Sequence, residues 1–193
     1  MLDIRDLLLS LASRDFEAAE RIRARGDLED IYHPELEEIH KVNAEQLNQI
    51  IDNHGLLGMS MVGVEGAEAV WLIIQHAISL PAFQRRCLAL LQEASLQGEF
   101  PAAYSAYLED RIRVNEGRPQ RFGTQFDWNE EGLLVPYPIE EPLMVNELRR
   151  SVGLNTMEEN VTNMRSTAGK PPVNSDEKKK EYERWLITVG WRA

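Results

Sequence analysis

Two histidines and a carboxylate at the start of one predicted helix form the first candidate site. His33, Glu37 and His40 are separated by four and three residues, so in a helix their side chains lie along one edge. Imidazole nitrogens and carboxylate oxygens are ligands of zinc and iron. The spacing predicts a single transition-metal ion, Zn or Fe, bound by these three residues. The alternative is that they only cap the helix and form hydrogen bonds in the core.

A second candidate is the pair Gln75 and His76, which interrupts the apolar stretch 67–78. An unpaired buried polar group costs roughly 1 to 3 kcal/mol, so both side chains need partners. Either they form a hydrogen-bond network between helices, or His76 faces a pocket as a ligand or general base. Asp110 is the carboxylate expected to orient His76, with a surface ion pair as its alternative. We therefore predict His76, Gln75 and Asp110 as catalytic residues.

A third group lies where the hydrophobic pattern changes to a period of two. Phe122, Thr124, Phe126 and Trp128 alternate with more polar residues, as on one face of a half-buried strand. This face is an aromatic wall with one hydroxyl, which suits either a small-molecule pocket or a core. The predicted substrate-binding residues are Thr124, Gln125, Phe122, Trp128 and Arg111.

These residues require a mainly helical scaffold. Prolines at first turns and glycines just past helix ends divide the chain into successive helices. The predicted helices cover 2–25, 34–54, a segment after Gly66, 81–98, 101–117 and 142–153, with a further one capped by Asn155. The segment from about 120 to 137 predicts a β-hairpin, with its turn at 129–132. The predicted fold class is mainly α, a compact multi-helix domain with one small β-hairpin.

The predicted domain organisation is simple. Residues 1–167 should form one helical domain, because a chain of 193 residues can bury roughly two thirds of its unfolded surface. Residues 168–177 are rich in Gly, Pro, Asn and Ser and predict a linker. Residues 178–193 predict a C-terminal helix that docks on the domain with an apolar face.

Composition excludes several classes of protein. The chain has 32 acidic and 21 basic residues, and its net charge of -11 argues against binding nucleic acid or a membrane surface. The most apolar stretch, 67–78, is shorter than the roughly 20 residues that span a bilayer. The run 7–9 is too short and too acidic in its surroundings for a signal peptide. Cys87 is expected as a buried core thiol. We therefore expect a cytoplasmic protein.

Several segments also carry a family resemblance. They are His33-Pro34, the stretch 69–77 ending in Gln75-His76-Ala77, Asp110-Arg111, and the stretch 117–125 with Gly123-Thr124-Gln125. With these segments the chain resembles the bacterial family of unknown function DUF6624 from about residue 10 to 165. The resemblance implies a compact, chiefly helical bacterial protein and no particular activity. The chain departs from the family pattern at Leu56-Leu57, where Trp-Pro is common, and at Phe122, where Tyr is usual. Any role of that Tyr hydroxyl is therefore in doubt in this chain.

Two functions follow from these residues. The first is a small enzyme, metal-assisted, that acts on a metabolite or a peptide-like substrate. In it, His76 and the group of His33, Glu37 and His40 line a pocket walled by the hairpin aromatics. The alternative is a non-catalytic binding or interaction protein with an acidic surface, because the chain contains no complete catalytic motif.

Overall fold

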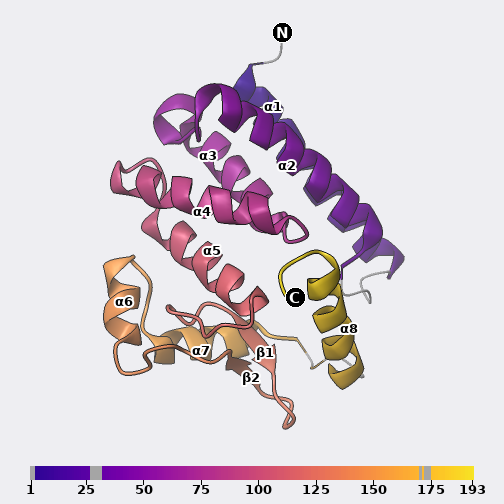
Figure 1. Cartoon of the computed structure of the whole chain (residues 1–193), viewed down its shortest axis with the longest axis vertical. Helices are drawn as coiled ribbons and strands as arrows, with labels where there is room; N and C mark the ends of the chain where they lie inside the picture. The colour runs from indigo at the N-terminus through magenta and orange to yellow at the C-terminus, as the bar shows by residue number, and fades with distance from the viewer. Residues whose placement is uncertain (1–2, 27–31, 170, 172–174) are drawn as a thin grey trace. The chain divides into compact units, whose positions relative to one another are not determined.

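The computed structural model describes residues 3–26, 32–169, 171 and 175–193. In this part of the chain it contains eight helices and one two-stranded sheet (Figure 1). The mainly helical fold with one small hairpin is thereby confirmed. The chain divides into two compact units, residues 1–100 and 101–193. The single domain over 1–167 stays a prediction.

The first unit contains four helices, α1 (Ile4–Arg25), α2 (Pro34–His54), α3 (Met59–His76) and α4 (Pro81–Leu96). Helices α2 and α4 begin at the predicted prolines, whose missing N–H costs nothing in a first turn. Helix α3 packs against α1, α2 and α4. The fully buried side chains of this unit include Leu8, Leu11, Leu47, Val70, Ile73, Ile74, Cys87 and Leu91. The prediction that Cys87 is a core thiol is confirmed.

Helix α3 begins earlier than predicted. The sequence placed its start after Gly66, whereas the helix begins at Met59 and is kinked at Gly63, whose φ is 70°. The early turn is stabilised by Glu99, whose backbone oxygen accepts from the N–H of Met59 at 3.2 Å and whose carboxylate accepts from Ser60 at 2.9 Å. The first N–H groups of a helix need acceptors from outside it, and here they come from a residue 40 positions away.

The second unit contains four helices and the hairpin. Its elements are α5 (Ala102–Asn115), β1 (Phe126–Trp128), β2 (Leu134–Pro136), α6 (Val145–Ser151), α7 (Met157–Thr167) and α8 (Ser175–Thr188). Helix α7 is capped by Thr156 rather than by Asn155. A capping box between Thr156 and Glu159 satisfies its first turn, and the Asn155 side chain accepts instead from Arg149.

The hairpin is shorter than the predicted segment. Strands β1 and β2 pair antiparallel, with Phe126 opposite Pro136. Residues 120–125 do not continue the strand, because Gly123 has a φ of 67° and the N–H groups of Arg121, Phe122 and Thr124 donate to the carboxylate of Asp110. A ladder partner cannot use N–H groups that are already engaged.

Helix α8 begins three residues before the predicted start and is held within the second unit by polar contacts. The Tyr182 hydroxyl donates to Asn115 Oδ1 at 3.1 Å. The Arg192 guanidinium donates to the backbone oxygens of Val114 at 2.9 Å and Asn115 at 2.7 Å, at the end of α5. A cation at a helix C-terminus satisfies carbonyl groups that have no partner within the helix.

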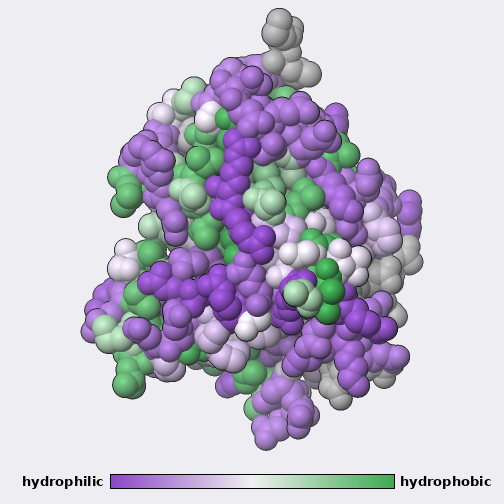
Figure 2. Space-filling view, in the orientation of Figure 1, coloured by the Kyte–Doolittle hydropathy of each residue, from purple (hydrophilic) through white to green (hydrophobic). Residues whose placement is uncertain are grey.

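None of the described helices combines the length and the apolar character that crossing a bilayer requires. Hydrophilic side chains predominate on the face shown in Figure 2.

Candidate functional site

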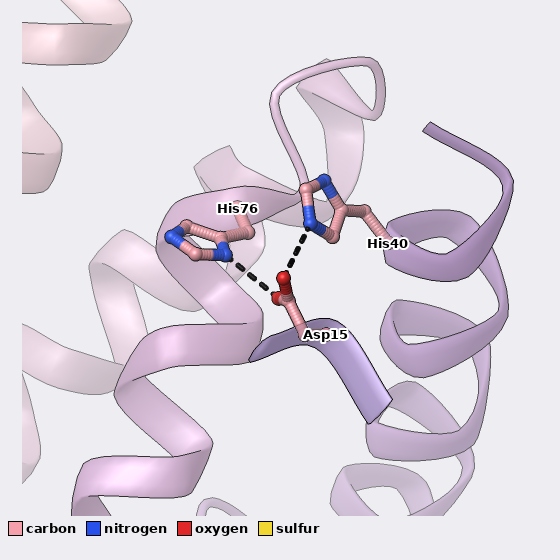
Figure 3. A group of neighbouring side chains, drawn as sticks. All are labelled: Asp15, His40 and His76. Carbon is pink, nitrogen blue, oxygen red and sulfur yellow. Dashed lines mark hydrogen bonds and ion pairs between the residues drawn. The ribbon is translucent and has the colours of Figure 1, made fainter. Parts of the chain in front are cut away.

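Three polar side chains from three helices of the first unit meet around one carboxylate. Asp15 comes from α1, His40 from α2, and His76 is the last residue of α3 (Figure 3). His40 Nε2 lies 3.0 Å from Asp15 Oδ1, and His76 Nδ1 lies 2.7 Å from Asp15 Oδ2. The centroids of the two imidazole rings are 4.9 Å apart. Each carboxylate oxygen of Asp15 therefore engages one histidine.

The three side chains differ in their access to solvent. Asp15 and His40 are buried, whereas the His76 side chain is 34% exposed. Nδ1 of His76 faces Asp15, and its Nε2 has no hydrogen-bond partner among the described residues. A molecule that approaches from solvent therefore meets His76 first, while Asp15 and His40 support it from inside.

Helix α1 places Asp15 in the core because of its position on the apolar stripe. The buried residues Leu8, Leu11, Ala18 and Ile22 recur at intervals of three and four, and Asp15 occupies the middle of this series. Asp15 is not among the residues predicted from the sequence. The signal was present, since an acidic residue at a core position of an amphipathic helix needs a buried partner.

The two histidines keep the buried carboxylate charged. Burial alone would raise the pKa of Asp15, but the hydrogen bonds to His40 and His76, together with the charges of their rings, outweigh burial and hold it well below its ordinary value. Asp15 is thus an ionised carboxylate at neutral pH. An ionised carboxylate can fix an imidazole tautomer or bind a cation.

Tyr32 completes the cluster from the residues just before α2. Its hydroxyl lies 2.5 Å from His40 Nδ1 and donates to the backbone oxygen of His76 at 3.0 Å. Its ring stacks on His40, with centroids 5.6 Å apart. Burial and the charges of Glu37 and Asp15 raise the pKa of Tyr32, so it stays a neutral hydroxyl. The sequence offered no signal for this role, because it depends on contacts across 44 residues.

Only His40 of the predicted metal trio belongs to this cluster. His33 caps helix α2, where its Nδ1 accepts from the N–H of Glu35 at 3.2 Å. Glu37 forms an ion pair with Lys41 at 2.6 Å, one turn further along the helix. The structure therefore joins His40 with Asp15 and His76 instead of with His33 and Glu37.

Of the predicted catalytic residues, His76 lies in the cluster. The carboxylate that orients it is Asp15 rather than Asp110. Within the second unit, Asp110 is fully buried and accepts from the N–H groups of residues 121, 122 and 124 and from the Thr124 hydroxyl. The backbone oxygen of Gln75 accepts from the side-chain amide of Gln84 at 3.3 Å.

The predicted substrate-binding residues lie in the second unit, most of them around one ordered loop. Thr124 donates to Asp110, and Gln125 donates to the Thr124 hydroxyl. Phe122 is buried, while Arg111 and Trp128 are half-buried. On the carbonyl side of the loop, buried Arg149 donates to the backbone oxygens of Phe122 and Gly123. The loop thus lies between the buried carboxyl group of Asp110 and the buried guanidinium of Arg149. Substrate binding by its side chains stays a prediction.

The chemistry available to the first unit follows from its donor atoms. One carboxylate and two imidazoles offer ligand atoms that all lie within 4.8 Å of one another. Two histidines and one carboxylate form the ligand set of many mononuclear zinc and non-haem iron sites. A buried carboxylate bonded to a histidine whose other nitrogen faces outward is also the arrangement of general acid/base pairs.

Comparisons with known proteins identify one relationship. A family model described as a family of unknown function, DUF6624, matches residues 8–170. Asp15, His40 and His76 all lie inside the matched span, and helix α8 lies outside it. Neither the curated proteins nor the solved structures contain a significant match. The match confirms the family resemblance that the sequence predicted.

Proposed function

The chain belongs to the family of unknown function DUF6624, so its activity has to be inferred from its own residues, and we propose that it is a small enzyme with Asp15, His40 and His76 as its reaction centre. The observation that supports this proposal is the buried carboxylate that bonds one imidazole with each oxygen. A buried ionisable group whose pKa is strongly shifted by specific charged partners, as that of Asp15 is, is characteristic of active sites.

A purely structural role explains the cluster less well. Position 15 lies on the apolar stripe of α1, where a leucine would pack between Leu11 and Ala18 without any desolvation cost. Replacing a buried ion pair by apolar side chains is often neutral or stabilising. A cluster that contributes little to stability in this way is better explained by chemistry than by packing.

The chemistry we propose is the activation of a water molecule that attacks a carbonyl carbon of a metabolite or a peptide-like substrate. Imidazole and carboxylate groups activate water both as general bases and as metal ligands. Because His76 is the exposed member, its outer edge is where the substrate makes contact. Asp15 and His40 hold it in place.

The charge of the first unit restricts the substrate. Residues 1–100 contain 17 acidic and 8 basic side chains, so nine of the eleven net negative charges of the chain lie there. Such a field repels anions and attracts cations. Neutral or cationic substrates, such as amides and amines, therefore fit better than phosphate esters.

The test compares turnover by matched variants when the substrate is not known in advance. A metabolite and peptide extract is incubated with the wild-type protein, with His76→Ala and with His54→Ala, and the products are followed by untargeted mass spectrometry. His54 is an exposed histidine at the end of α2 and serves as the control. We expect the same compounds to be consumed by wild type and His54→Ala, and none by His76→Ala at an unchanged thermal midpoint. Identical profiles for wild type and His76→Ala would refute the enzyme.

A further inference from the structure

We propose that Asp15, His40 and His76 bind one divalent transition-metal ion of the zinc or iron type, through a carboxylate oxygen, His40 Nε2 and His76 Nδ1. This inference rests on the proposed function in that the ion would activate the water. Metal binding can nevertheless be measured without any substrate. The inference replaces the predicted trio of His33, Glu37 and His40 by a set in which the ligands come from three helices.

The Tyr32 hydroxyl contacts two polar atoms, and its single proton can be donated to only one of them. A phenol has one proton, and a backbone carbonyl can only accept a hydrogen bond. The Tyr32 hydroxyl therefore donates to the backbone oxygen of His76 at 3.0 Å. The same hydroxyl lies 2.5 Å from His40 Nδ1. Both contacts are satisfied as hydrogen bonds in the tautomer in which Nδ1 carries a proton and the hydroxyl accepts it.

The protonation of His40 Nδ1 determines whether Nε2 of the same ring can donate to Asp15. In a neutral imidazole with a proton on Nδ1, Nε2 has only a lone pair. That nitrogen lies 3.0 Å from Oδ1 of Asp15, and a carboxylate oxygen also can only accept. In this tautomer two lone pairs would face each other, so a proton or a metal ion has to lie between them.

A metal ion accounts for the positions of all three side chains at once. Both histidines turn a ring nitrogen toward the same carboxylate, although they come from different helices (Figure 3). Ligands of one ion at about 2.1 Å can lie at most about 4.2 Å apart. The ligand atoms of the cluster lie within 4.8 Å of one another, so small side-chain rotations bring them to one ion.

The surroundings match those of a catalytic rather than a structural metal site. Catalytic zinc has three protein ligands and keeps one position for water or substrate, and this cluster supplies three ligand residues. Metal-bound histidines commonly donate their other N–H to a neighbouring oxygen, and the Tyr32 hydroxyl lies 2.5 Å from Nδ1 of His40. The excess of acidic residues in the first unit also favours a cation.

The test is titration of the full chain, purified without a histidine tag and stripped with a chelator, with ZnCl2 by calorimetry. We expect one ion per chain, bound with a dissociation constant on the order of 1 μM or below. Asp15→Asn, His40→Gln and His76→Ala should each weaken binding at least about 100-fold, and Tyr32→Phe about 10- to 100-fold. His33→Ala and Glu37→Gln are the controls and should bind as wild type does.

A second measurement on the wild-type protein avoids variants that fail to fold. Nitrogen-15 spectra of the imidazoles should show Zn²⁺ bonded to His40 Nε2 and His76 Nδ1. Two outcomes overturn the metal site: His40 that stays protonated on both nitrogens with excess Zn²⁺, or zinc binding that is lost in the His33 or Glu37 controls. If zinc does not bind but His76→Ala still abolishes turnover, the metal site is refuted and the enzyme stands. If zinc binds but no compound is turned over, the metal site stands and the enzyme is refuted.

Discussion

Single and double replacements of Asp15 and His40 should have different effects on the free energy of unfolding. A single replacement leaves one partner buried without the other, whereas the double replacement removes both. Asp15→Leu keeps the branching of the side chain but leaves His40 buried without its carboxylate. In the metal-free protein this removes one charge-assisted hydrogen bond to His40 and one to His76. At roughly 1.5 to 3 kcal/mol each, and with about half of the bond to half-exposed His76 replaced by water, the loss is about 2 to 4 kcal/mol.

The double variant Asp15→Leu/His40→Leu should behave differently. It removes both members of the pair, and its two leucines extend the apolar stripes of α1 and α2. We expect its free energy of unfolding to lie within about 1 kcal/mol of wild type or above it, as for other buried ion pairs replaced by apolar residues. Because the loss in Asp15→Leu alone exceeds that of the double variant, the coupling energy between the two positions is at least about 1 kcal/mol, and any loss in His40→Leu adds to it.

The assay is equilibrium unfolding in urea at neutral pH with chelator, followed by circular dichroism. The midpoint and slope of each transition give the free energy for wild type, both single variants and the double variant. Losses of the two single variants that simply add in the double variant would contradict the reasoning. They would mean that Asp15 and His40 do not interact as the structure shows.

Three further predictions concern single groups. Burial raises the pKa of Cys87 to about 12, so a thiol reagent at about pH 8 should leave the native protein unmodified and react only after unfolding in urea. The lowered pKa of Asp15 means that, in metal-free protein, its contribution to stability is complete above about pH 4 and lost as the pH falls further. In Asp15→Asn the urea midpoint of unfolding should therefore fall less steeply with decreasing pH below about pH 4. An unchanged pH dependence in this variant would contradict the prediction. Gly123→Ala should cost about 1 to 3 kcal/mol in urea unfolding, because φ is 67° and the new Cβ lies 2.4 Å from Met157 Sδ. Gly153→Ala, with φ of 76° and no neighbour within 4 Å, is the control and should cost less.

Local features of the sequence predicted most of the helices. Pro34 and Pro81 mark helix starts because a first turn needs no N–H from them. Gly26 marks the end of α1 because its φ of 79° is readily adopted only by glycine. These features act within one turn of the chain, so a single sequence reveals them. The start of α3 was missed because its acceptor, Glu99, lies far along the chain.

The candidate site was predicted only in part. His76 and His40 were recognised as polar groups on buried faces, but each was assigned the wrong neighbours in the structure. His40 shares a helix edge with His33 and Glu37, and this spacing suggested a site on one helix. In the folded chain the buried side of α2 turns His40 toward Asp15, and solvent-accessible partners satisfy the other two residues.

Periodicity and turn residues were enough to predict the helical class, the hairpin and the buried thiol, and the family was also recognised from the sequence. Only the tertiary structure decided that Asp15, His40 and His76 meet, since their separations of 25 and 61 positions are closed by the packing of α1 against α2 and α3. Spacing along one helix identifies side chains that share a face. Which faces meet depends on the core that packs between them.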